Sequence, residues 1–300
     1  MIGANDAMTN LEAVKAVALR HAGSASTAFP RLGIRTLDRP TDFSGLTYVP
    51  MVCLVLQGAK RTVIGDQVLD YGAGSCMVVA AEVVAIGQIS EASPEAPYLA
   101  ANLYLDPAVI SALLIEMSDM REPPIDTGFG ISKADPELLD VWRRLTGLLD
   151  RPHEIPVMAH HLEHELMFRL LKGPQGALLR QIAGTDSRLS HIRRAMRWIR
   201  EHFAEHLSIE VMATVAGMSV SVFHRHFKAV TGLTPLQYHK HVRLNEARRR
   251  LVSEHDAAAT VGFSVGYESA SQFSREYKRL FGAPPRRDAD MVQAIVDPGP

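Results

Sequence analysis

The stretch Ser219–Pro235 has the sequence SVSVFHRHFKAVTGLTP, and the stretch Ser269–Pro285, fifty positions later, has the sequence SASQFSREYKRLFGAPP. About one identity between two such stretches is expected by chance. Seven positions are identical: Ser219/Ser269, Ser221/Ser271, Phe223/Phe273, Arg225/Arg275, Lys228/Lys278, Gly232/Gly282 and Pro235/Pro285. We therefore expect the same structural unit to occur twice.

Each stretch predicts one helix. Ser219 and Ser269 are typical N-cap residues, and each pattern ends at a glycine that is followed by a proline. The residues expected in the core lie three or four positions apart: Phe223, Phe227 and Val230 in the first stretch, and Phe273, Tyr277 and Leu280 in the second.

The opposite side of each predicted helix is polar and basic. At 100° per residue, Ser221, Arg225 and Lys228 lie away from the core stripe, as do their counterparts fifty positions later. Such a face suits phosphates and base edges, so double-stranded DNA is the expected partner. The predicted DNA-binding residues are Ser221, His224, Arg225 and Lys228 in the first stretch and Ser271, Ser274, Arg275 and Lys278 in the second.

A shorter helix precedes each stretch, over Leu207–Val215 and Asp256–Phe263, and a glycine-containing turn joins each pair. Two helices and such a turn form a helix-turn-helix. Between the units, Leu236–Leu251 predicts a helix of about 24 Å. Two nonidentical units at that separation are expected to bind successive major-groove segments.

The C-terminal third resembles the AraC/XylS family of transcription regulators. The resemblance rests on AGMSVSVFHRHFKAVTGLTPLQY, RLNEARRRL and VGYESASQFSREYKRLFGAPP. It implies a sequence-specific DNA-binding regulator whose C-terminal domain is all-α and carries two helix-turn-helix units.

Charge is divided unevenly along the chain. The 300 residues have a formal net charge of −1, yet residues 188–287 hold 17 Lys and Arg against 8 Asp and Glu, and the remainder holds 15 against 25. Arg248–Arg250 alone would also fit an ordinary solvated helix face. Together with the duplicated unit, the basic surplus indicates a polyanionic partner.

Residues 30–106 predict short strands separated by Gly, Pro and Asp, which is typical of a sandwich or small barrel. The segments CLVLQGAK, YGAGSCMVVA and SPEAPYLAANLYLD resemble the cupin-like N-terminal domain of one subgroup of the same family. The expected fold class is α+β multidomain: an N-terminal cupin-like β-barrel or jelly roll with flanking helices, followed by the all-α domain.

Three helices are expected after the barrel, over Pro107–Met117, Pro136–Leu149 and Ile155–Leu171, with a crossing over Ser118–Asp135. The resemblance implies that such helices pair with those of a second subunit, so a homodimer is expected. The predicted domains are residues 1–172 for sensing and dimerisation, 173–188 as a linker, 189–288 for DNA binding, and 289–300 as a loose tail.

Two other functional classes could also account for a basic C-terminal domain. A cupin-like enzyme tethered to DNA would need metal ligands, but the sequence has no histidine between His21 and His153. His160 and His164 share a helix face, but without the general-base Glu of the H-E-x-x-H motif or a third ligand. No enzyme activity, metal or cofactor is therefore expected. The other class is a DNA-architectural protein without a ligand.

The effector and the cellular location are predicted from the remaining features. Cys53 and Cys76 are the only cysteines, no secretory pattern opens the chain, and the longest apolar stretch is too short to cross a bilayer. A cytoplasmic, nucleoid-associated protein without membrane contact is expected, with RNA polymerase as a candidate second partner. The expected effector is an uncharged or mildly polar organic molecule, and covalent modification of Cys53 or Cys76 is a less favoured signal because both lie in apolar strand sequence.

Overall fold

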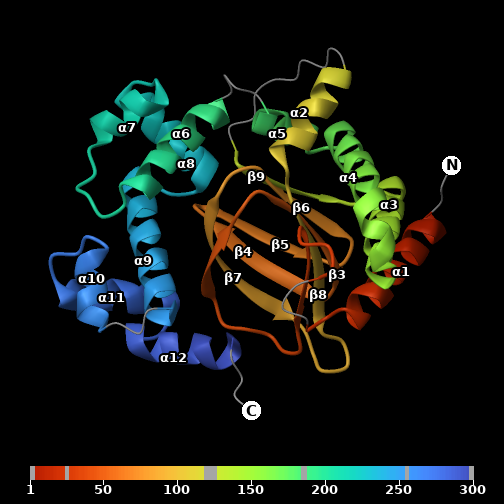
Figure 1. Cartoon of the computed structure of the whole chain (residues 1–300), viewed down its shortest axis with the longest axis horizontal. Helices are drawn as coiled ribbons and strands as arrows, with labels where there is room; N and C mark the ends of the chain where they lie inside the picture. Colours follow the sequence, from red (N-terminus) through yellow and green to blue (C-terminus); the bar gives the residue numbers. More distant parts are fainter. Residues whose placement is uncertain (1–3, 24–26, 118–126, 184–187, 254–256, 297–300) are drawn as a thin grey trace.

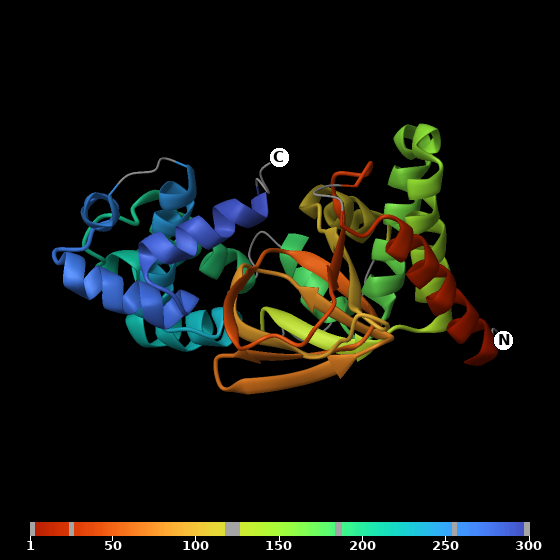
Figure 2. The same ribbon diagram turned by 90° about the horizontal axis from the view of Figure 1, so that it is seen from below.

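The computed structural model describes residues 4–23, 27–117, 127–183, 188–253 and 257–296. Figure 1 and Figure 2 show two sheets between a set of C-terminal helices on one side and α1, α3 and α4 on the other. The expected order of a β-rich domain followed by a helical one is confirmed.

Among the described residues, nine strands form two antiparallel sheets, ordered β1-β8-β3-β6-β9 and β2-β7-β4-β5. The described strands thus make a jelly-roll-like sandwich with open edges, so of the two expected forms the sandwich is right and the closed barrel is wrong. A crossing without regular structure was expected over Ser118–Asp135. Residues 118–126 lie outside the described residues, and the later part of this segment forms strand β9. The strands are β1 Leu32–Leu37, β2 Ser44–Tyr48, β3 Met51–Gln57, β4 Ala59–Ile64, β5 Gln67–Gly72, β6 Ser75–Val79, β7 Val83–Glu91, β8 Tyr98–Tyr104 and β9 Phe129–Lys133.

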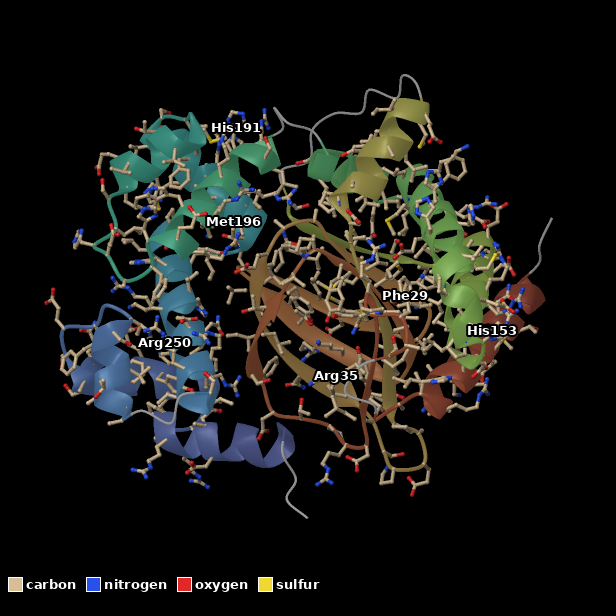
Figure 3. The ribbon with its side chains drawn as sticks, viewed as in Figure 1. Phe29, Arg35, His153, His191, Met196 and Arg250 are labelled. Atoms are coloured by element: carbon tan, nitrogen blue, oxygen red, sulfur yellow. The ribbon has the colours of Figure 1, made fainter. Side chains whose placement is uncertain are left out.

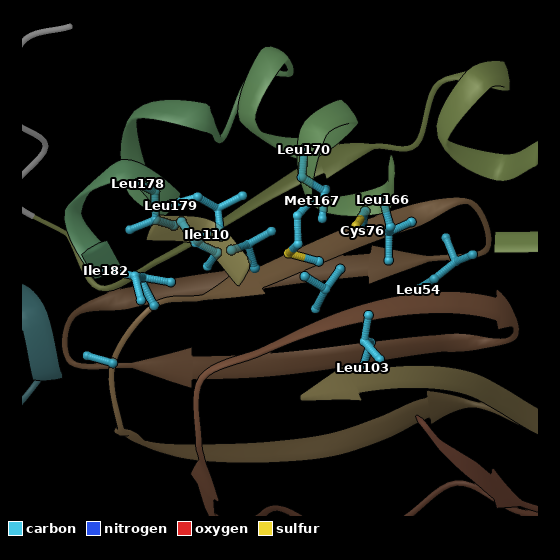
Figure 4. Close-up of a cluster of buried hydrophobic side chains, with 14 of the residues drawn as sticks. Leu54, Cys76, Leu103, Ile110, Leu166, Met167, Leu170, Leu178, Leu179 and Ile182 are labelled. Atoms are coloured by element: carbon cyan, nitrogen blue, oxygen red, sulfur yellow. The ribbon is translucent and has the colours of Figure 1, made fainter. Parts of the chain in front are cut away.

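The five-stranded sheet is buried on both faces, which explains the continuous apolar run of β3. Cys53 faces the other sheet, in the core of the sandwich. Cys76 faces outward beneath the helices, and Figure 4 shows it near Leu166 and Leu170 of α4. Alternation along the strands therefore separates the two cysteines onto opposite faces.

The α-helices described in the N-terminal domain are α1 Ala4–Arg20, α2 Pro107–Glu116, α3 Pro136–Gly147, α4 Ile155–Lys172 and α5 Gly176–Ala183. Two 3₁₀ turns, Leu148–Asp150 and Pro152–Glu154, join α3 to α4. Within the predicted linker of residues 173–188, residues 176–183 are a packed helix, because α5 buries Leu178, Leu179 and Ile182 against the sheet (Figure 4). Residues 184–187 lie outside the described residues.

The helices that the structure describes in the C-terminal domain are α6 Arg188–Glu201, α7 Ile209–Ala216, α8 Val220–Thr231, α9 Pro235–Ser253, α10 Ala258–Ser264, α11 Ala270–Phe281 and α12 Pro285–Val296. α12 continues to Val296, where a loose tail was expected from residue 289, and residues 297–300 lie outside the described residues. Its Asp288 is buried and accepts hydrogen bonds from Arg248 of α9 at 2.8 and 2.9 Å and from the Tyr277 hydroxyl of α11 at 2.8 Å. A buried carboxylate with such partners fixes the helix that carries it.

The two domains share one hydrophobic core, which runs from the outer face of the five-stranded sheet through α4, α5 and α6 to Phe223 and Tyr238. Among the described residues, none of the helices combines the length and apolar character that a bilayer crossing requires.

Candidate nucleic-acid interface

The duplicated stretches form α8 and α11, which we call the reader helices. Both end at a glycine in the left-handed conformation, Gly232 with φ 77° and Gly282 with φ 82°. The amide of Gly232 donates to the Lys228 carbonyl and that of Gly282 to the Lys278 carbonyl, both at 2.8 Å. The predicted helix ends are confirmed, because glycine adopts this conformation at little cost.

The aromatic cores of the reader helices also repeat. The ring centroids of Phe223 and Phe227 lie 5.3 Å apart with an interplanar angle of 61°, and those of Phe273 and Tyr277 lie 5.5 Å apart at 65°. Both members of each pair lie on one helix at i, i+4, so the two helices present the same edge-to-face aromatic stripe to the core. All four side chains are fully buried, as expected.

The turns before the reader helices differ. Residues 217–219 separate α7 from α8, whereas residues 265–269 separate α10 from α11. Gly217 and Gly266 both have positive φ, 66° and 91°. Ser269 accepts a hydrogen bond from the Gln272 amide, while Ser219 occupies the N-cap position without such a bond.

The predicted DNA-binding side chains lie on the outer side of the reader helices, which we call the reader faces. All are exposed except His224, which is half-buried: Ser221, Arg225, Lys228, Ser271, Ser274, Arg275 and Lys278. Within the described part of the chain, Arg225, Arg275 and Lys278 have no ion-pair partner. The protein therefore does not neutralise these three charges, and of the three side chains only Arg225 lines the cleft described next.

The reader face of α8 lies against the N-terminal domain. Together with the β4–β5 turn, including Gly65 and Asp66, it lines a cleft of about 610 Å³. Lys228 Nζ lies 3.8 Å from Asp66 Oδ2. A helix that binds in the major groove, which is about 12 Å wide, has DNA on its outer face and on both sides. Because the β4–β5 turn already lies against this face of α8, the arrangement leaves α8 no room for duplex DNA.

Glycine permits the close approach at this cleft. A Cβ on Gly232 would lie 2.8 Å from the backbone nitrogen of Gly65, and a Cβ on Gly65 would lie 2.8 Å from the Gly232 carbonyl oxygen. α11 meets the sandwich at Leu280, whose Cδ1 would lie 3.1 Å from a Cβ on Gly45 of β2. Ser271, Ser274, Arg275 and Lys278 do not line the cleft that covers α8.

A polar cluster between the domains was missed at the sequence level. Glu82 accepts hydrogen bonds from Arg200 of α6 at 2.6 Å and from the Tyr238 hydroxyl of α9 at 2.8 Å. Burial, followed by the nearby Glu82 charge, raises the pKa of Tyr238, so the phenol stays a neutral donor. The available signal was one acidic residue in the apolar run Cys76–Gly87, but its partners lie 118 and 156 positions away.

The other predicted features have simpler surroundings. Burial raises the pKa of the Cys53 thiol to about 11 and also raises that of Cys76, so both are protonated near neutral pH. His164 Nε2 lies 3.9 Å from Glu116 Oε1, and the His160 and His164 rings are 6.1 Å apart. Over the described ranges, no group of three or more His, Cys, Asp or Glu side chains is arranged to hold a metal ion.

Comparisons with known proteins cover both domains. The family model described as AraC-type transcriptional regulator N-terminus matches residues 28–178, and a helix-turn-helix domain model matches residues 212–290. The HTH-type transcriptional activator RhaS of Escherichia fergusonii is 36% identical over 122 residues, which cover 39% of this chain and 43% of that protein. RhaS of Salmonella schwarzengrund is 28% identical over 166 residues, or 55% of this chain and 59% of that protein. The matches thus span about half the length of these relatives.

Solved structures of ToxT from Vibrio cholerae share the fold along most of the chain. ToxT bound to an unsaturated fatty acid has a TM-score of 0.59 and 8% identity, and covers 87% of this chain and 94% of its own. ToxT bound to a naphthalenyl butenoic acid has a TM-score of 0.60 and 9% identity, with 87% and 98% covered. Because the sequences are only 8–9% identical, the similarity to ToxT establishes the two-domain fold alone.

Proposed function

Since this chain belongs to the family of AraC-type transcriptional regulators, we propose that it is a one-component regulator in which α8 and α11 read DNA and the N-terminal sandwich binds a small organic effector. The observation that carries the proposal is the duplicated reader helix, with matching glycine ends, aromatic cores and outward Arg and Lys side chains. Relatives described as transcriptional activators, and ToxT with bound fatty acids, support it.

The two reader helices read different bases. His224 and Ser274 occupy equivalent positions at the edges of the reader faces, and these side chains offer different hydrogen bonds. α9 has 19 residues and separates the units by about 28 Å at 1.5 Å per residue. One chain then contacts successive major-groove segments about 34 Å apart, on a site without internal symmetry.

The effector acts on the domain contact. The arrangement described above covers α8, so DNA binding by both reader helices needs a second arrangement in which the β4–β5 turn has moved away. An effector shifts the balance only by binding one arrangement more tightly than the other, and such coupling is typically about 1–3 kcal/mol.

The proposed assembly and location follow the family. A homodimer presents two pairs of reader helices, and the exposed Val157 of α4 and Ile115 of α2 offer apolar surface for it. RNA polymerase is a second partner, and the protein works in the cytoplasm on nucleoid DNA. No specific observation favours a tethered enzyme or an architectural protein.

The proposal is tested by genome-wide mapping of bound sites with the full chain, followed by affinity measurements on the recovered sequence. The expected result is a discrete set of asymmetric sites about two helical turns long. Binding spread evenly along the genome would leave an architectural protein as the better account. A footprint confined to one groove segment would remove the role of the second reader helix.

A further inference from the structure

A second cavity, of about 290 Å³, lies inside the sandwich between the two sheets. Its apolar wall includes Met51, Cys53 and Ile89, and three tyrosines, Tyr48, Tyr71 and Tyr98, also line it. The volume lies at the lower end of the range of about 300–1,000 Å³ for ligand pockets. A ligand here has one ring or a short chain.

The charge of this cavity is positive. Arg35 of β1 and Lys60 of β4 line it, and none of its lining residues is acidic. Arg35 lies opposite Ala100 in the β1–β8 ladder, and Ala100 belongs to the sandwich core, so the two share the inward face. Figure 3 shows Arg35 at the strands of the sandwich.

Neither cation is neutralised by the protein. Within the described ranges no carboxylate pairs with Arg35 or Lys60, and Lys60 Nζ instead lies 5.1 Å from the centroid of the Tyr48 ring. Burial raises the pKa of Tyr71 and of Tyr98, so these phenols carry no compensating negative charge at neutral pH. Arg35 is exposed and Lys60 is half-buried. Two cations without a carboxylate partner beside an apolar wall favour an anionic ligand, because an ion pair in a partly enclosed cavity is stronger than in bulk water.

One acceptor in the cavity has no donor. Asn102 Oδ1 is buried without a hydrogen-bond partner, and Asn102 lies opposite Cys53 in the β3–β8 ladder, on the cavity side. An unpaired buried amide oxygen is costly, and a hydroxyl or amino group on a ligand would satisfy it.

We propose that this cavity binds a compact organic monocarboxylate with a hydroxyl or amino group, its carboxylate held by Arg35 and Lys60 and its donor group bonded to Asn102 Oδ1. The inference rests on the proposed function, for which it names the effector class. It departs from the uncharged effector expected from the apolar strand pattern, because Arg35 and Lys60 are inward-facing cations within otherwise ordinary strands.

The cavity is connected to the DNA-binding domain through β2. Ser44, Leu46, Thr47 and Tyr48 of this strand all line the cavity. Thr47 Oγ1 accepts a hydrogen bond from Asn245 of α9 at 3.3 Å, and Gly45 lies against Leu280 of α11. A ligand that shifts β2 therefore changes contacts with both helices.

The test uses matched probes on the full chain. Hydroxy- and amino-substituted monocarboxylates of about 8–14 non-hydrogen atoms, which suit a pocket of this size, are each compared with the corresponding carboxamide; 4-hydroxybenzoate and 4-hydroxybenzamide form one such pair. Thermal shift selects binders, and calorimetry gives the dissociation constants. At least one acid should bind at least about tenfold more tightly than its amide. If no acid binds better than its amide, the proposal is wrong.

Substitutions of the two cations test whether the selected acid binds in this cavity. Arg35→Gln and Lys60→Gln should each weaken binding of the selected acid at least about tenfold, and Lys60→Arg should restore most of it. Arg61→Gln is the matched control, because Arg61 follows Lys60 on β4 but pairs with Asp70 at 2.6 Å outside the cavity. Acid binding that survives both Gln substitutions would place the site elsewhere.

DNA binding is measured separately in the same variants. Arg35→Gln should still occupy the mapped genomic sites without the acid. A chain that binds DNA but shows no preference for acids overturns only the effector class, whereas a chain that binds no genomic site overturns the proposed function itself.

Discussion

Lys228 Nζ of α8 lies 3.8 Å from Asp66 Oδ2 at the β4–β5 turn, which places a predicted DNA-contacting side chain against the sensor domain. Both side chains are largely exposed, at 54% and 82%, so the pair itself contributes little to stability. The shared hydrophobic core and the hydrogen bonds of Glu82 hold the domains together instead, and the glycines at positions 65 and 232 permit the close approach.

Gly232→Ala and Gly282→Ala separate the two roles of these glycines. Both residues have left-handed φ values, so each substitution costs about 1–2 kcal/mol of helix-end strain. Only at Gly232 does a Cβ also meet the sensor, whereas nothing lies within 4 Å of one at Gly282. We expect Gly232→Ala alone to increase the radius of gyration in X-ray scattering and the DNA affinity without effector. Equal behaviour of the two variants would mean that this contact does not hold the domains closed.

Glu82→Gln weakens the hydrogen bonds to Arg200 and Tyr238 without removing the side chain. Since coupling between domains is typically about 1–3 kcal/mol, we expect several-fold tighter DNA binding in the absence of effector. Glu91→Gln, at the exposed end of the neighbouring strand β7, serves as the control. Fluorescence anisotropy with a mapped site gives the affinities, and an unchanged value for Glu82→Gln would contradict the closing role.

Two histidines of α9 predict a pH dependence of stability. Burial lowers the pKa of His239 and of His241 to about 4, below the ordinary value of 6.5. The unfolded chain then binds protons that the folded chain excludes, so the stability from neutral histidine is present above about pH 6.5 and is lost as the pH falls towards 4.

Chemical denaturation at pH 7 and pH 5 measures this effect. We expect the double variant His239→Gln, His241→Gln to lose on the order of 1–3 kcal/mol less than the wild type over that interval. His153→Gln, at an exposed site, should retain the wild-type difference. If all three proteins lose the same free energy of unfolding between pH 7 and pH 5, α9 tolerates the charged imidazoles.

The protonated state of the Cys53 and Cys76 thiols predicts that the effector acts without covalent modification of the protein. With the pKa of Cys53 at about 11, the reactive thiolate is scarce at pH 7. A Cys53→Ser, Cys76→Ser double variant should therefore still respond to the effector in a reporter assay, after correction for expression level. The effector is added at saturating concentration, because Cys53 lines the proposed cavity and its substitution can change the affinity. Loss of the response at normal expression would support covalent modification instead.

Local features of the fold were predictable from the sequence because they depend on local periodicity. Gly232 and Gly282 end their helices where expected, and Phe223 and Phe273 are fully buried. The outward direction of Arg225 follows from the same 100° rule. These properties need only the helix geometry and the repeat.

Long-range contacts were not predictable in this way. Nothing near Glu82 in the sequence identifies Arg200 or Tyr238, and Asp288 gives no sign that it binds Arg248 and fixes α12. The position of α8 against the sensor depends on the packing of one domain on another, which neither domain's own pattern encodes. The inward direction of Lys60 depends on strand register, which one residue of slip would reverse.

Recognition of specific bases by the reader faces of α8 and α11 is tested by the ratio of specific to nonspecific DNA affinity in alanine variants. Arg225→Ala and Arg275→Ala should each weaken specific binding by about 1–3 kcal/mol and relax base preference at different groove segments. Lys228→Ala should weaken binding to all sequences alike, and Arg39→Ala, on the sensor surface, should change neither affinity. If Arg225→Ala and Arg275→Ala leave the ratio at its wild-type value, these helices do not read the sequence.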